Sequence, residues 1–128
     1  MKVEKLERLA IGVPNLEEAM KDFSRIFGID FETGVLEPIL PGETKIRCAV
    51  STKGVELVEK PGKAIAVASF HFRVKDLDEA TAWVEKNGGT IIGRFSVNQM
   101  EEVITNTFGL RIILVYYPGD DPIKAAKG

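Results

Sequence analysis

The segment Val13-Pro14-Asn15-Leu16-Glu17-Glu18-Ala19 has a near copy in the second half of the chain, Val74-Lys75-Asp76-Leu77-Asp78-Glu79-Ala80. A second pair of similar segments follows, because Leu57-Val58-Glu59-Lys60-Pro61-Gly62 resembles Leu114-Val115-Tyr116-Tyr117-Pro118-Gly119. We therefore predict a single domain, 1–128, built from one unit that occurs twice. Module one covers about 1–62 and module two about 63–119, and a polar tail over 120–128 is expected to be frayed.

Each module is predicted to have the order strand, helix, strand, strand, strand. Polar and apolar residues alternate over 7–13 and again over 69–74, which is typical of half-buried strands. Each strand is followed by a capping-box pattern, Asn15 with Glu18 and Asp76 with Glu79, which marks the start of a helix. The predicted fold class is therefore α+β.

Composition excludes several classes of function. The chain has 128 residues and a net charge of −2, with acidic and basic residues mixed, so it has no basic field that would attract nucleic acid or an anionic membrane. Cys48 is the only cysteine, and its apolar surroundings predict a reduced core thiol. No apolar run is long enough to span a bilayer, and residues 1–5 lack the apolar stretch of a signal peptide. We expect a cytoplasmic protein.

The repeated motif resembles the vicinal-oxygen-chelate superfamily, which includes glyoxalase I, bleomycin-resistance proteins, methylmalonyl-CoA epimerase and extradiol dioxygenases. The resemblance rests on the doubled Val-x-Asn/Asp-Leu-x-Glu-Ala pattern, on Glu56-Leu57-Val58 and on Gly109-Leu110-Arg111-Ile112-Ile113-Leu114-Val115. It covers nearly the whole chain. It implies a glyoxalase-like fold, in which two tandem βαβββ modules form a curved mixed sheet around a cleft, and it suggests a homodimer.

The resemblance also implies four metal-ligand positions on the first and last strands of the two modules. In this chain they carry Arg8, Glu56, Ser69 and Ile113. Only Glu56 matches the ligands of the superfamily, because a guanidinium has no lone pair to donate and an isoleucine offers no ligand atom. We therefore expect neither a tightly bound metal nor another cofactor. A divalent metal recruited through Glu56, His71 and an unrecognised third ligand remains the alternative.

In place of a metal we predict an ion pair between Arg8 and Glu56, with the guanidinium replacing the charge of the metal. The alternative is that Arg8 extends into solvent at the sheet edge.

Strand alternation adds further residues to the predicted cleft. Several arginines around one concavity suit a carboxylate or a phosphate, although each of them is also compatible with a solvated sheet edge. Arg47 is expected to join them if its strand has the register of the superfamily. The predicted ligand-binding residues are Arg8, Glu56, Ser69, His71, Arg73, Arg111, Ile113 and Tyr117.

His71 is the only histidine and lies on the same strand face as Ser69. It is the candidate catalytic base, and the alternative is an ordinary packed side chain. Tyr116 and Tyr117 must point to opposite faces of their strand, so we expect Tyr116 beneath the helix and Tyr117 at the cleft.

The preferred function is a glyoxalase or bleomycin-resistance-like protein that binds a small anionic or aromatic metabolite in its cleft without a metal, and the sequence leaves open whether it catalyses a reaction. The alternative is a metal-dependent lyase, isomerase (epimerase) or dioxygenase of the same superfamily. The apolar segment 35–41 and Trp83 are interpreted as a lid, a dimer contact or ordinary packing.

Overall fold

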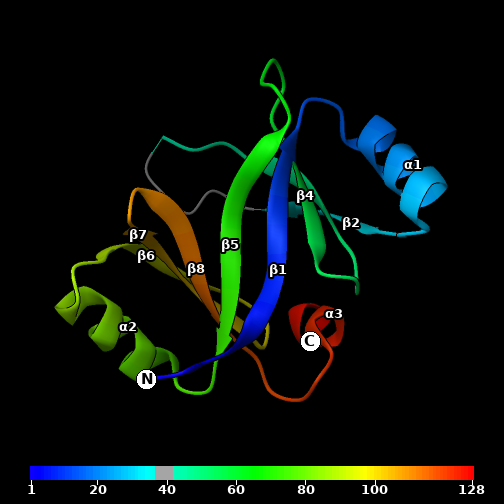
Figure 1. Cartoon of the computed structure of the whole chain (residues 1–128). Coiled ribbons are helices and arrows are strands. Elements are labelled where there is room, and N and C mark those ends of the chain that lie inside the picture. The colour runs from blue at the N-terminus through cyan, green and yellow to red at the C-terminus, as the bar shows by residue number, and fades with distance from the viewer. Residues whose placement is uncertain (37–41) are drawn as a thin grey trace. The chain divides into compact units, whose positions relative to one another are not determined.

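The computed structural model describes residues 1–36 and 42–128 (Figure 1). For Leu36 it describes the backbone but not the side chain. Most of the apolar segment 35–41 therefore lies outside the described residues. The strands are β1 (Val3–Val13), β2 (Glu32–Leu36), β3 (Ile46–Val50), β4 (Val55–Glu59), β5 (Ala66–Val74), β6 (Thr90–Val97), β7 (Met100–Thr107) and β8 (Leu110–Tyr116). The helices are α1 (Leu16–Phe27), α2 (Leu77–Lys86) and α3 (Pro122–Lys127). The predicted βαβββ order therefore occurs twice, and the α+β fold class is confirmed.

The chain forms two compact units, one over Arg8–Ala68 and one that combines Met1–Glu7 with Ser69–Gly128. In the unit Arg8–Ala68 the strands have the order β2-β3-β4-β1. β1 and β4 are parallel, whereas β3 is antiparallel to both β4 and β2.

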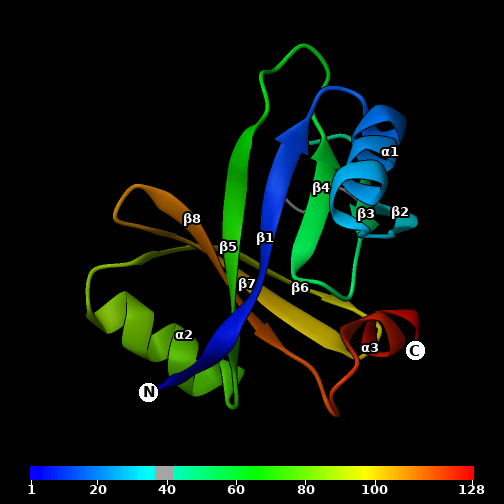
Figure 2. The same cartoon turned by 45° about the vertical axis from the view of Figure 1, so that its right-hand side comes forward.

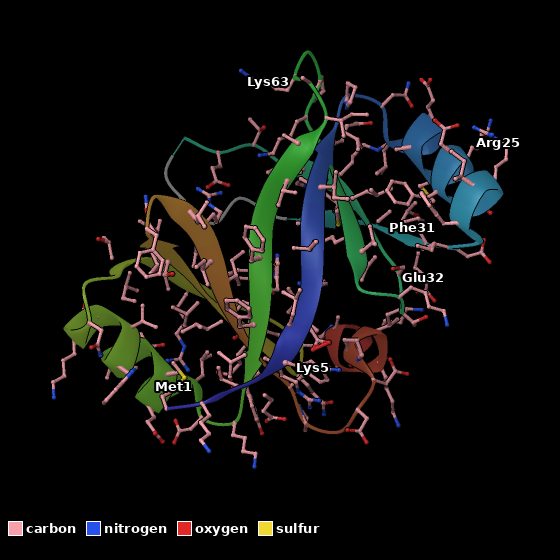
Figure 3. All side chains as sticks on the ribbon, viewed as in Figure 1. Met1, Lys5, Arg25, Phe31, Glu32 and Lys63 are labelled. Atoms are coloured by element: carbon pink, nitrogen blue, oxygen red, sulfur yellow. The ribbon has the colours of Figure 1, made fainter. Side chains whose placement is uncertain are left out.

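Helix α1 packs on one face of these strands, beside β3 and β4. The core between them contains Val13, Leu16, Ala49 and Leu57, all nearly inaccessible to solvent. Phe31 packs against this core, and Figure 3 shows Arg25 projecting from α1 into solvent. Because side chains alternate along a strand, the residues between these core positions point to the opposite face.

In the other unit the order is β5-β8-β7-β6, with β5 and β8 parallel and the remaining pairs antiparallel. Helix α2 covers one face of β6, β7 and β8 (Figure 2). Val74, Leu77, Ala80, Val103 and Leu114 form the core beneath it. Tyr116 packs against this cluster, as the alternation of the strand predicted.

The predicted caps define both helix starts. The side chain of Asn15 accepts a hydrogen bond from the backbone N–H of Glu18 at 3.0 Å, and Asp76 accepts one from Glu79 at 3.0 Å. Gly28 ends α1 with a left-handed backbone (φ 66°), a conformation that glycine adopts without steric cost.

The prediction of a frayed tail over 120–128 is wrong. Asp121 caps α3, and Ala125 on this helix is 2% exposed. The backbone N–H of Gln99 donates to the carbonyl of Ala125 at 3.0 Å, which attaches the helix to the β6–β7 turn. Polar composition alone therefore misjudged a segment that is held by caps and backbone hydrogen bonds.

Across the described ranges, 1–36 and 42–128, none of the helices has the length and apolar character needed to cross a membrane.

Candidate functional site

A buried ion pair joins the first and last strands of the unit Arg8–Ala68. Nε of Arg8 on β1 donates to Oε1 of Glu56 on β4 at 2.6 Å. Arg8 is 8% exposed and Glu56 is 4% exposed, so the pair is largely removed from water. The predicted contact is confirmed, and the alternative of an Arg8 side chain in solvent is wrong.

The sheet register explains why the two side chains meet. Glu56 is the direct neighbour of Ala10 across the parallel β1–β4 pair, and Arg8 precedes Ala10 by two residues on the same face. The adjacent Leu57 points to the other face, into the core beneath α1. The ion pair therefore lies on the face of the strands opposite α1.

These residues do not fit a divalent metal. A metal at Glu56 needs further ligands with lone pairs, whereas Arg8 brings a permanent positive charge and no lone pair to the same carboxylate. Within the described part of the chain, no group of three His, Cys, Asp or Glu side chains is arranged to hold a metal ion.

The second unit contains a chain of three buried polar side chains. Oγ of Ser69 lies 2.9 Å from Nε2 of His71, and Nδ1 of His71 lies 3.2 Å from Oε1 of Glu102. Ser69, His71 and Glu102 are 5%, 4% and 4% exposed. We call these three residues the Ser69–His71–Glu102 chain.

The chemistry of the partners defines the direction of these hydrogen bonds. When Glu102 is ionised, its carboxylate only accepts hydrogen bonds, so Nδ1 of His71 carries the hydrogen. Nε2 of His71 is then the acceptor, and the Ser69 hydroxyl donates to it. The imidazole is thus arranged to take a proton from Ser69.

This unit differs from the superfamily pattern in the position of its acidic side chain. Ile113 on β8 pairs directly with His71 and is 7% exposed, so the implied ligand position is apolar and buried. The nearby carboxylate comes from Glu102 on β7 instead. Sequence reasoning missed Glu102, which follows the acidic Glu101 directly and precedes Val103, so no apolar surroundings single it out in the sequence.

Arg73 and Tyr117 lie together in a separate cluster of the same unit. The guanidinium of Arg73 lies 3.9 Å from the centre of the Tyr117 ring, and its Nη2 donates to the backbone carbonyls of Tyr117 and Gly119. The Tyr117 hydroxyl donates to the Glu7 carboxylate at 2.7 Å. Arg73 thus fixes the segment that follows β8 by hydrogen bonds, and its guanidinium forms a cation–π interaction with the Tyr117 ring.

The other two arginines considered for the cleft, Arg47 and Arg111, lie at the surface. Arg111 is exposed on β8. Arg47 on β3 forms ion pairs with Glu17 of α1 and with Glu59, on the face that α1 covers. The expectation that Arg47 joins the other arginines is wrong, because Arg47 shares the face of Ala49, which packs beneath α1. The Arg47 hydrogen bond lowers the pKa of Glu17, and Glu17 raises the pKa of Arg47.

Comparisons with known proteins place this geometry in a wider context. No family model matches the sequence, and no curated protein matches it. Methylmalonyl-CoA epimerase of Streptomyces coelicolor, in complex with 2-nitronate-propionyl-CoA, superposes with a TM-score of 0.76 at 14% identity, covering 92% of this chain and 100% of the epimerase. The chain has the fold of the vicinal-oxygen-chelate superfamily.

Two further structures with the superfamily fold agree. The epimerase of Mycobacterium tuberculosis has a TM-score of 0.73 at 18% identity, over 97% of this chain and 93% of the epimerase. A 4-hydroxymandelate synthase variant of Streptomyces coelicolor has a TM-score of 0.73 at 12% identity, over 91% of this chain and 50% of the synthase. These likenesses confirm the fold that the duplicated motif indicated, while activity depends on the residues that a particular chain places on that fold.

Proposed function

We propose that this protein binds a small anionic or aromatic metabolite without a divalent metal, as the preferred sequence interpretation holds. The 2.6 Å ion pair between Arg8 and Glu56 supports this proposal most directly. The guanidinium of this pair occupies a position at which the resemblance implies a metal ligand, and it offers hydrogen-bond donors in place of lone pairs. A guanidinium attracts a carboxylate or a phosphate but supplies no Lewis acid.

The ligands of the structural neighbours support an anionic compound. The neighbouring epimerases are bound to 2-nitronate-propionyl-CoA and to methylmalonyl-CoA, both of which carry several negative charges. We propose that the ligand of this protein belongs to the broader class of small carboxylates and acyl thioesters. Ser69 and His71 were also predicted as ligand-binding residues, and they belong to the other compact unit.

The test combines elemental analysis with ligand binding. Protein purified without added metal is analysed by inductively coupled plasma mass spectrometry and then screened by thermal shift against small carboxylates, aromatic acids and acyl-CoA esters. We expect less than stoichiometric metal, and stabilisation by at least one anion that persists in EDTA. Stoichiometric transition metal, or binding that EDTA abolishes, contradicts the proposal.

A pair of arginine variants makes the test specific. Arg8→Met removes the buried charge at nearly constant volume, and Arg25→Met makes the same change at a residue whose side chain is 70% exposed on α1. We expect the ligand-induced shift to be lost in Arg8→Met and retained in Arg25→Met. Arg8→Lys keeps a positive charge and should retain part of the shift, which separates loss of charge from loss of folding.

The second candidate is a superfamily enzyme of the lyase, isomerase or dioxygenase type. It is favoured by the structural neighbours, which include an epimerase and a synthase. A metal-dependent version requires Glu56 and His71 to leave the partners that they contact here. Activity that appears only when a divalent metal is added would support this candidate.

We also propose a homodimer, which light scattering coupled to size-exclusion chromatography tests.

A further inference from the structure

We propose that Ser69 is an activated nucleophile and that the Ser69–His71–Glu102 chain transfers acyl groups from small activated esters or thioesters. This activity goes beyond the proposed ligand binding, and it uses neither Arg8 nor Glu56.

The connectivity of the three side chains carries the inference. A serine nucleophile needs a base at hydrogen-bond distance from Oγ, and the base needs a third group that orients it. Here Nε2 of His71 lies 2.9 Å from the Ser69 oxygen, and Nδ1 lies 3.2 Å from Glu102. Each imidazole nitrogen therefore contacts the partner that its role requires.

The fold does not need a histidine at position 71. In the duplicated motif, His71 lies three residues before Val74, and the equivalent residue before Val13 is Ala10. Ala10 is 2% exposed, so module one fills the same strand position with a small apolar side chain. Burying polar groups costs free energy even when they are hydrogen bonded. Packing alone therefore does not explain why a histidine occupies this position.

The surroundings of the Ser69–His71–Glu102 chain favour nucleophilic chemistry over metal binding. Ile113 lies beside His71 across the β5–β8 pair and contributes no competing ligand or charge. Ser69 lies near the beginning of β5, three residues after Ala66, and both Ala66 and Val67 are exposed. Ser69 itself is only 5% exposed, so access to its hydroxyl is narrow and the proposed acyl group is small.

The proposed reaction has two balanced steps. Ser69 Oγ attacks the acyl carbon while its proton moves to Nε2 of His71, and a bond forms between Oγ and that carbon. The bond from the carbon to the leaving oxygen or sulfur then breaks, and His71 returns the proton to the alcohol or thiol. Water attacks the acyl-serine in the same manner, which releases a carboxylic acid and restores Ser69. Glu102 is a positioning residue that holds the Nδ1–H and stabilises the imidazolium.

The experiment measures acylation of the intact protein. The protein is incubated with 4-nitrophenyl acetate and, separately, with a fluorophosphonate probe, and the modified residue is identified by peptide mass spectrometry. We expect a burst of 4-nitrophenol and modification at Ser69. Modification at another residue, or none at all, overturns the proposal without any need for a variant.

Variants then assign the roles. Ser69→Ala and His71→Gln should abolish labelling of the Ser69 position, whereas Glu102→Gln should slow it by roughly 10² to 10⁴-fold. Glu102→Asp should recover part of that loss, which a merely structural role would not predict. Ser51→Ala is the matched control, because Ser51 is also 5% exposed but donates to the carbonyl of Val55 rather than to a base.

Two outcomes of the variant series contradict the proposal. Labelling that continues at the wild-type rate in His71→Gln would mean that His71 is not the base. Ester hydrolysis that persists in a folded Ser69→Ala would mean that His71 acts directly on water and that Ser69 is only its hydrogen-bond partner.

Discussion

Replacing Glu56 by glutamine tests the energetic role of the buried ion pair. The substitution keeps the shape of the side chain and removes its charge, while the Arg8 side chain, 9% exposed, remains cationic. Removing one partner of such a buried pair costs about 3 to 5 kcal/mol. At about 4 °C per kcal/mol for a domain of this size, the melting temperature should fall by about 12 to 20 °C. Urea unfolding followed by circular dichroism measures the free energy directly.

Two further variants make this result interpretable. Because burying two charges is itself costly, Arg8→Met combined with Glu56→Leu should lie within about 1 kcal/mol of the wild type. Asp22→Asn breaks an exposed pair with Arg25 on α1 and should cost less than about 0.5 kcal/mol. The reasoning is refuted if Glu56→Gln costs no more than Asp22→Asn, or if the Arg8 and Glu56 substitutions are additive in the double variant.

Three other substitutions test the caps, the packing and the electrostatics. Asn15→Ala removes the cap of α1 and should lower the free energy of unfolding by about 1 kcal/mol in urea titrations. Gly89→Ala should cost about 1 to 3 kcal/mol, because a Cβ there would lie 2.4 Å from Cγ1 of Val84; an unchanged melting temperature would contradict this contact. Because Arg47 lowers the pKa of Glu17 below 4.5, the ionised carboxylate stabilises the fold above that pH, and the contribution is lost as the pH falls further. Glu17→Gln should therefore reduce the difference in stability between neutral and acid solution, and an unchanged difference would argue against the Glu17–Arg47 pair.

The parts of the structure that sequence predicted are those encoded locally or by duplication. Asn15 and Asp76 begin their helices where the capping pattern placed them, since a cap depends on residues only three positions apart. The Arg8–Glu56 contact was predictable for a different reason. The resemblance to a known fold supplied the pairing of β1 with β4, which no local pattern contains.

The parts that were missed depend on the partners that distant residues find. The position of Arg47 was misjudged because the prediction lacked the register of β3, and shifting a strand by one residue exchanges its two faces. Glu102 was missed because its role depends on β7 lying next to β8, within reach of His71. The helix α3 was missed because its backbone bond to Gln99 is non-local.

His71 is the only histidine in the chain, and it is 4% exposed. The imidazole region of a proton or nitrogen NMR spectrum will therefore contain the signals of a single side chain, and these need no assignment by mutagenesis. The buried contact with Glu102 should protect the Nδ1 hydrogen from rapid exchange with water, so that its resonance becomes observable at low field. An uncharacterised ligand that reaches Ser69 would be detected as a shift of that one resonance, in unmodified protein and without an enzymatic assay.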